Sequence, residues 1–314
     1  MGHRLFDDDE LAALARPYRD RVADAIERAA AGSPDDPAAA LTTLVAGIER
    51  RQARFVDGFH RFVAAIEEWL ALESPGSTND ATDTIEQLAA LDRAVHESTL
   101  LDLATYGMPD DLQADGPARI AELATAGNVA DALALFHQRQ DALRRRHDVA
   151  VDRVAAALSW VYRTFGVDQL ESCLRHCGAR TLLGWMPHDV ARPLDVRIRQ
   201  WVELGLANFA TLRVEESDDE VVIVQDPCGT CSRQVLQGVY GPPLDFAVVE
   251  ERHPITWQRG DTPVYRTHVA VMHDLMPREL TGRPWPRIEC PLGVSAGPCR
   301  QRFEKAPAPV TPAG

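Results

Sequence analysis

The sequence contains no run of about 18 apolar residues, the length that a helix needs to cross a membrane. Its first ten residues, MGHRLFDDDE, contain neither the apolar core nor the small-residue cleavage pattern of a signal peptide. Positive charge is also scarce, because 33 Lys and Arg stand against 47 Asp and Glu, for a formal net charge of −14. A chain this acidic lacks the basic surface that displaces counterions from nucleic acid. We therefore expect a cytoplasmic protein that binds neither membranes nor nucleic acid.

Several catalytic motifs are missing as well. The chain has no P-loop, no G-x-G-x-x-G after a strand and no H-E-x-x-H. Nucleotide-binding, dinucleotide-binding and zincin functions therefore have no support in the sequence. The chain does contain 45% hydrophobic and 25% charged residues, which is enough apolar material for a core and is not typical of disorder.

The first two thirds of the chain are rich in helix-forming residues, with Pro and Gly clusters between the segments. Apolar residues recur at helical spacing in two long segments, which is typical of the seams of a helix bundle. We predict helices over 9–30, 38–72, 82–106, 117–126, 129–165, 167–184 and 189–207. The predicted fold is mainly α: a multi-helix bundle over 1–207, a small irregular α+β region with cysteines over 208–304, and a disordered tail over 305–314.

The pattern changes near Ala210. Residues 211–215 and 220–224 are rich in β-branched residues and flank an acidic turn, which predicts a hairpin. The composition of 264–271 predicts one more strand. Four of the six cysteines follow the hairpin, and a cytoplasmic protein uses such cysteines more often as ligands, redox groups or buried thiols than in disulfides.

The sharpest local motif is the C-x-x-C of Cys228 and Cys231, placed at the end of a predicted strand. Such a motif is the usual half of a metal knuckle, since its glycine lets backbone amides turn toward the thiolates. Cys290 and Cys299 are the candidates for the second half, and His268 is an alternative ligand in place of one thiolate. We expect zinc or another divalent metal. A redox dithiol, an iron–sulfur cluster and buried unligated thiols are the alternatives.

This stretch resembles an incompletely characterised group of bacterial proteins that carry D-P-C-G-S-G-G-R, then Y-C-x-H-C, then a P-C segment. The corresponding residues here are DPCGTCSR from Asp226, YRTHV from Tyr265, and Pro298-Cys299. The resemblance covers roughly the last third of the chain and implies a metal-bearing helical protein. Arg266 and Val269 stand where that pattern has cysteines, whereas Cys231 and Cys290 are additional. Either the metal shell has moved onto Cys231 and Cys290, or metal binding has been lost.

A second candidate site lies in the predicted bundle. His147 falls on the apolar seam of the helix over 129–165, with Asp148 beside it, and a histidine titrates near neutral pH. The alternative is a core histidine whose ring nitrogens are satisfied by neighbours. Cys173, His176 and Cys177 share one helical face, where burial of small thiols is the simpler interpretation.

Together these patterns favour a metal-dependent enzyme of lyase or hydrolase type that acts on a small polar molecule. Cys228, Cys231, His268, Cys290 and Cys299 are the candidate metal ligands, and His147 with Asp148 would transfer protons. The pocket is expected between the bundle and the C-terminal region. The alternative is a non-catalytic binding or regulatory protein with a structural zinc knuckle.

Overall fold

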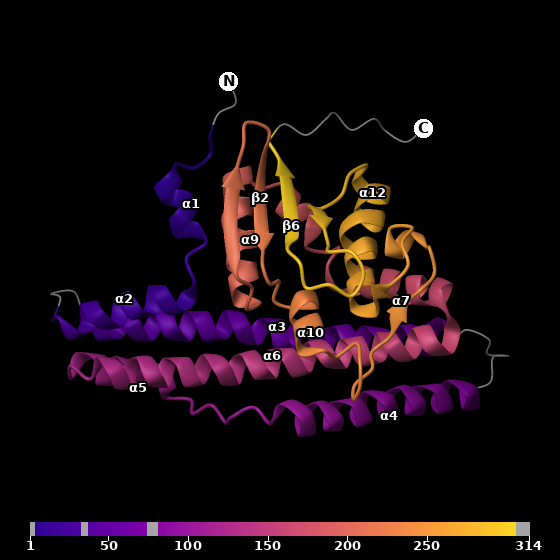
Figure 1. Cartoon of the computed structure of the whole chain (residues 1–314), viewed down its shortest axis with the longest axis horizontal. Helices are drawn as coiled ribbons and strands as arrows, with labels where there is room; N and C mark the ends of the chain where they lie inside the picture. Colours follow the sequence, from indigo (N-terminus) through magenta and orange to yellow (C-terminus); the bar gives the residue numbers. More distant parts are fainter. Residues whose placement is uncertain (1–3, 33–36, 74–80, 306–314) are drawn as a thin grey trace.

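The computed structural model describes residues 4–32, 37–73 and 81–305, and it is mainly α (Figure 1). Within these ranges the helices of the first two thirds are α1 (Asp8–Leu14), α2 (Tyr18–Ala30), α3 (Pro37–Glu73), α4 (Ala81–Tyr106), α5 (Gly116–Thr125), α6 (Val129–Phe165), α7 (Val167–Thr181), α8 (Met186–Val190) and α9 (Leu194–Ala207). The predicted fold class is confirmed. Residues 306–314 of the predicted tail lie outside the described residues.

The two 37-residue helices α3 and α6 run side by side through the molecule (Figure 1). Much of their apolar seams is buried, as Ile48 and Ile66 of α3 and Leu158 of α6 show. α4 packs on one side of this pair, and the C-terminal region lies on the other. α6 ends at Gly166, whose φ of 83° is a backbone conformation that favours glycine.

Two predicted helices are broken by proline. The segment predicted over 9–30 forms α1 and α2, with Pro17 directly before α2. The segment predicted over 189–207 begins at the end of α8 and continues as α9, with Pro193 directly before α9. Proline lacks the N–H that a helix interior needs, and it pushes the preceding residue toward extended backbone.

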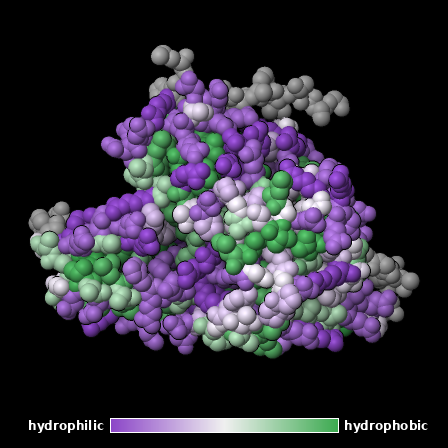
Figure 2. All heavy atoms as spheres, viewed as in Figure 1, coloured by the Kyte–Doolittle hydropathy of each residue, from purple (hydrophilic) through white to green (hydrophobic). Residues whose placement is uncertain are grey.

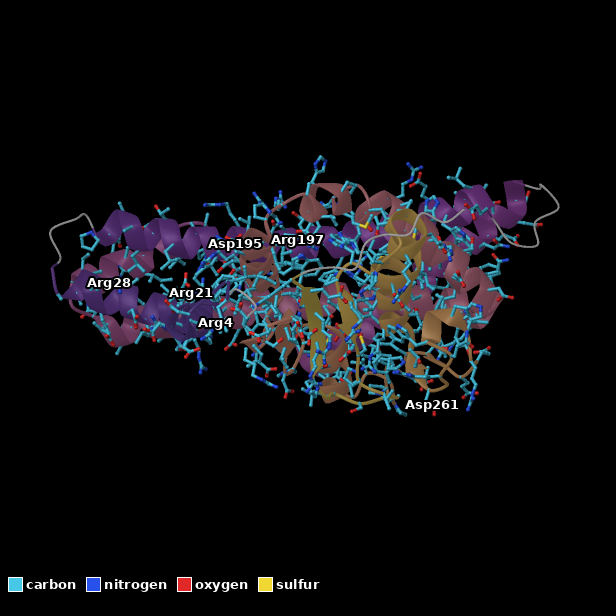
Figure 3. All side chains as sticks on the ribbon, turned by 90° about the horizontal axis from the view of Figure 1, so that it is seen from above. Arg4, Arg21, Arg28, Asp195, Arg197 and Asp261 are labelled. Atoms are coloured by element: carbon cyan, nitrogen blue, oxygen red, sulfur yellow. The ribbon has the colours of Figure 1, made fainter. Side chains whose placement is uncertain are left out.

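Viewed from above, Arg21 and Arg28 mark α2 at one end of the long helices, far from Asp261 in the C-terminal region (Figure 3).

The main sheet is antiparallel, with strand order β1-β2-β6-β5. Its strands are β1 (Leu212–Glu216), β2 (Glu220–Gln225), β5 (Arg287–Glu289) and β6 (Cys299–Glu304). The predicted hairpin is confirmed as β1 and β2, whereas β6 inserts beside β2 from the end of the described chain. A two-stranded ladder joins β3 (Val248–Val249) to β4 (Thr262–Pro263), and the short helix α10 (Cys231–Gln237) follows β2.

The strand predicted over 264–271 is wrong. This segment is helical throughout, as η2 (Val264–Arg266), α11 (Thr267–Val269) and η3 (Ala270–Leu275), and it continues into α12 (Met276–Thr281). Its side chains are buried almost without interruption, so β-branched composition reflects packing on all sides rather than a pleated surface. Short apolar runs of this kind do not distinguish a buried helix from a buried strand.

The N-terminal segment is tied to the sheet through Glu216 at the end of β1. The backbone N–H groups of Leu5 and Phe6 donate to its two carboxylate oxygens over 2.6 and 3.1 Å, and Lys305 pairs with it at 2.6 Å. One carboxylate thus joins the first and last parts of the described chain. Among the described residues, no helix combines the length and the apolar character that crossing a membrane requires.

Candidate functional site

The register of the sheet brings two distant cysteines together. Gln225 of β2 pairs with Cys299 of β6, and Glu289 of β5 pairs with Arg300 of β6. Continuing the second register by one residue places Cys290 opposite Cys299. Because Cys228 follows Gln225 by three residues, the C-x-x-C motif begins at the same end of the sheet.

The four sulfurs form two pairs that interact with each other. The pKa of Cys228 is lowered mainly by a hydrogen bond from the Cys231 thiol. Burial acts in the opposite direction, and hydrogen bonds from Ser232 lower the pKa further. The hydrogen bond with Cys290, then burial, raises the pKa of Cys299, and the charges of Cys228 and Cys231 act in the same direction. The two pairs therefore lie within each other's electrostatic field. All six cysteines of the chain are free thiols.

Backbone groups around Cys228 favour its thiolate form. The Ser232 N–H lies 3.1 Å from the Cys228 sulfur, and the Thr230 backbone contributes a further hydrogen bond. Gly229 makes this turn sterically feasible, because a Cβ at that position would lie 1.5 Å from the carbonyl oxygen of Asn208. The C-x-x-C turn is thus seated directly on the segment that follows α9.

The thiols do not converge on a common point as the ligands of a metal site do. In the part of the chain that the structure describes, no three His, Cys, Asp or Glu side chains converge in an arrangement that would hold a metal ion. His268 is engaged by other groups: its Nδ1 contacts the carbonyl oxygen of Tyr265, and its ring packs against Phe62 and Tyr265. No hydrogen bond found within the described ranges joins His268 to the four thiols. Burial lowers the pKa of His268 to about 4.

His147 is enclosed in the core of the molecule with a solvent exposure of 0%. Its Nε2 lies 2.6 Å from Oδ1 of Asn208, and its Nδ1 lies 3.3 Å from Oδ1 of Asp148. The rings of Phe59 and Phe209 pack edge-on against it. Both ring nitrogens therefore have partners, and the histidine joins α6 to the segment after α9, against which the C-x-x-C turn packs.

Asp148 links α6 to α10. Nε and Nη2 of Arg233 donate to its two oxygens over 3.0 and 2.9 Å, and Nε2 of Gln237 donates over 3.0 Å. Burial alone would raise the pKa of Asp148, but the hydrogen bonds from His147 and Arg233 and the charge of Arg233 outweigh it and lower the pKa to about 2. On the face shown in Figure 2, hydrophilic side chains gather over the middle of α6, next to α10.

The sequence interpretation missed most of this network. Arg233 and Asn208 contact Asp148 and His147, and Gln234 of α10 donates through Nε2 to Oδ1 of Asp152 over 2.8 Å. The positions of Arg233 and Gln234 directly after the C-x-x-C motif were the available signal, whereas Asn208 lies 20 residues before Cys228 and gave none. Three buried carboxylates are incompletely bonded, since Oδ2 of Asp102, Oδ2 of Asp152 and Oδ1 of Asp189 have no hydrogen-bond partner among the described residues.

A nucleophile-elbow motif was also overlooked, because Gly293-Val294-Ser295-Ala296-Gly297 matches G-x-S-x-G. The motif functions on a sharp turn between a strand and a helix. Here the segment is an irregular loop before β6, and the Ser295 hydroxyl accepts from the backbone N–H of Gly297. The structural context of a serine hydrolase is therefore missing at this serine.

Asp152 provides a test of the buried network. Burial raises its pKa well above the usual range, so its ionisation favours unfolding as the pH rises above about 3.9, the value expected in the unfolded chain. Asn keeps an acceptor for Gln234 without a charge. We expect Asp152→Asn to raise the free energy of unfolding by about 1 kcal/mol at pH 7. Denaturant titrations at pH 7 and at pH 3 measure the gain, which should vanish at pH 3. Equal destabilisation at both pH values would contradict this account.

No family model, curated protein or solved structure matches this chain. Its class is therefore defined by its own fold and site: a mainly α protein whose C-terminal sheet gathers four thiols beside a buried network of charged side chains.

Proposed function

We propose that Cys228, Cys231, Cys290 and Cys299 hold one structural zinc ion in a non-catalytic binding or regulatory protein. The observation that carries this proposal is the gathering of the two cysteine pairs at one end of the sheet, from segments about 60 residues apart in the chain. The metal would fix the C-x-x-C turn and α10 to β5 and β6.

The donor chemistry supports the proposal. Zinc is bound by thiolates, and structural sites with four thiolates are closed tetrahedra. Three of the four cysteines are buried, and backbone N–H groups already favour the thiolate at Cys228. The resemblance to proteins with a D-P-C-G motif points in the same direction. Because the sulfurs lie as two pairs, binding would draw the pairs together around the ion.

The positions of the histidines favour a structural role over catalysis. A catalytic zinc keeps an open position for water or substrate, next to a group that moves protons. His147 is fully enclosed with both ring nitrogens bonded, and Nδ1 of His268 is bonded to the carbonyl oxygen of Tyr265. Neither ring is therefore placed to transfer protons beside an ion held by the thiols, as the metal-dependent lyase or hydrolase hypothesis requires of His147.

Metal content of the purified full-length chain tests the proposal. We expect about one zinc ion per chain, since four thiolates fill a tetrahedral shell. Replacing the zinc by Co²⁺ should give the visible absorption of a tetrahedral thiolate complex. Cys228→Ser and Cys299→Ser should lose both the metal and this absorption.

Cys173→Ser is the matched control, because Cys173 is equally buried but lies in α7 with Cys177. It should keep the full metal content. A protein that holds no zinc and takes up no Co²⁺ after reduction would contradict the proposal. An intrinsic visible spectrum with bound iron and sulfide would replace zinc by an iron–sulfur cluster.

A further inference from the structure

The turn between Cys228 and Cys231 brings these two cysteines within reach of a disulfide bond. The Cys228 sulfur accepts from the backbone N–H of Ser232 over 3.1 Å, and this nitrogen belongs to the peptide bond that directly follows Cys231. By standard backbone geometry the nitrogen lies about 2.4 Å from the Cα atom of Cys231, so the Cys228 sulfur lies within about 5.5 Å of that Cα atom. A disulfide joins Cα atoms about 4.4–6.8 Å apart, a separation that the ends of a four-residue turn also have.

The two thiols of this turn are not equivalent. The hydrogen bond from Cys231 lowers the pKa of Cys228 against the effect of burial, and Ser232 supports the same thiolate. The hydrogen bond with Cys228, followed by burial, raises the pKa of Cys231, whose sulfur lies 3.7 Å from Oγ1 of Thr230. The thiolate is the form of cysteine that attacks a disulfide. Cys228 therefore has the properties of a nucleophile, and Cys231 those of a second thiol that keeps its proton until later.

The surroundings of the turn limit what can reach it. The loop over 291–297 packs against it, since the Ser232 hydroxyl donates to the carbonyl oxygen of Gly297 over 3.3 Å. Arg266, itself 1% exposed, donates to three carbonyl oxygens of the same loop over 2.7–2.9 Å. The two cysteines of the turn keep 5% and 6% of their surface exposed. Such limited exposure suits a small molecule rather than the surface of a folded protein.

We propose that Cys228 and Cys231 are a redox-active dithiol whose substrate is a small-molecule disulfide. The Cys228 thiolate attacks one sulfur of the substrate, the S–S bond breaks, and one small thiolate leaves with its electron pair. Cys231 then gives up its proton and attacks the Cys228 sulfur, which expels the second small thiolate. The dithiol loses two electrons and becomes a disulfide. The substrate becomes two thiols, which take up the proton of Cys231 and the one that Cys228 released on ionising.

This inference goes beyond the proposed function, because the exchange uses two sulfurs and no metal. The test uses the full chain, freed of metal by a chelator and equilibrated with glutathione and glutathione disulfide. Alkylation of the remaining thiols, followed by mass spectrometry of peptides, assigns the state of each cysteine. In the wild type we expect a Cys228–Cys231 disulfide that returns to two thiols when glutathione is in excess.

Two variants separate the roles of the two cysteines. Cys231→Ser should stop at the mixed disulfide and retain one glutathione on Cys228, since the second thiol is missing. Cys228→Ser should take up glutathione at least about 10-fold more slowly, because the remaining thiol is less ionised. Cys173→Ser is the matched control and should match the wild type, because Cys173 and Cys177 are completely buried in α7.

A wild-type chain that forms no disulfide, or whose disulfide joins any other pair of cysteines, would overturn the inference. This result comes from the wild type, so it decides even if a variant fails to fold. A chain that binds zinc but forms no disulfide would overturn the redox role alone. A chain that forms the disulfide but binds no zinc would contradict the proposed function alone.

Discussion

Removing the metal with a strong chelator should destabilise the C-terminal region far more than the long helices. Zinc-finger peptides gain about 10–16 kcal/mol of apparent free energy from a structural zinc ion, because binding and folding occur together. In this chain, β2, β5 and β6 are short and their shared end carries the cysteines, whereas α3 and α6 are packed along their whole length. The loss should therefore be local rather than global.

Hydrogen exchange of backbone amides, with and without the chelator, measures this effect. We expect β2, β6 and α10 to lose protection by several orders of magnitude, while α6 keeps most of its protection. Cys228→Ser provides the control, since a chain without the metal should not respond to the chelator. Uniform loss of protection across α6 and the sheet, or no loss at all, would contradict a structural metal in the C-terminal region.

Asp148→Ala should be the most damaging substitution in the buried network. It leaves Arg233 and His147 without their shared acceptor, and breaking one side of a buried ion pair destabilises a protein by about 3–5 kcal/mol. The double variant Asp148→Leu with Arg233→Met should recover a large part of this loss, because it removes both charges and keeps the volume. Chemical denaturation of the single and double variants measures the difference. A loss below about 1 kcal/mol for Asp148→Ala would contradict the role assigned to the pair.

The same carboxylate predicts part of the acid sensitivity. The pKa of Asp148 is lowered to about 2 in the folded chain, against about 3.9 when unfolded. Its stabilisation is therefore present above pH 4 and is lost as the pH falls toward 2, by about 2–3 kcal/mol. Asp148→Asn should flatten this part of the stability profile. Asp152→Asn acts with the opposite sign, because its pKa is raised.

The fold was predictable where the hydrophobic pattern is long and regular. The helix predicted over 129–165 has the bounds of α6, because 37 residues of consistent spacing leave little ambiguity. The hairpin of β1 and β2 followed from two segments with β-branched residues on either side of an acidic turn. The helical segment over 264–275 was not predictable, because its periodicity is masked by burial on every side.

The site was predictable only in part. Spacing in the chain singled out Cys228, Cys231, Cys290 and Cys299 because cysteine is chemically distinctive, whatever its surroundings. The seam position of His147 showed that a polar ring would enter the core. Its partner Asn208 comes from a connecting segment 61 residues away, and such a contact depends on tertiary packing that no local pattern encodes. Arg266 also gave no local sign that its charge would be buried.

The hydrogen bond between Phe6 and Glu216 can form only late in the synthesis of the chain. The acceptor for the N-terminal segment is translated about 200 residues later, and Lys305 reaches the same carboxylate later still. Translation proceeds at about 5–20 residues per second, so tens of seconds pass between the synthesis of α1 and that of β1, against which α1 packs. Phe6, which is 1% exposed in the folded chain, therefore lacks its hydrogen bond to β1 during that time.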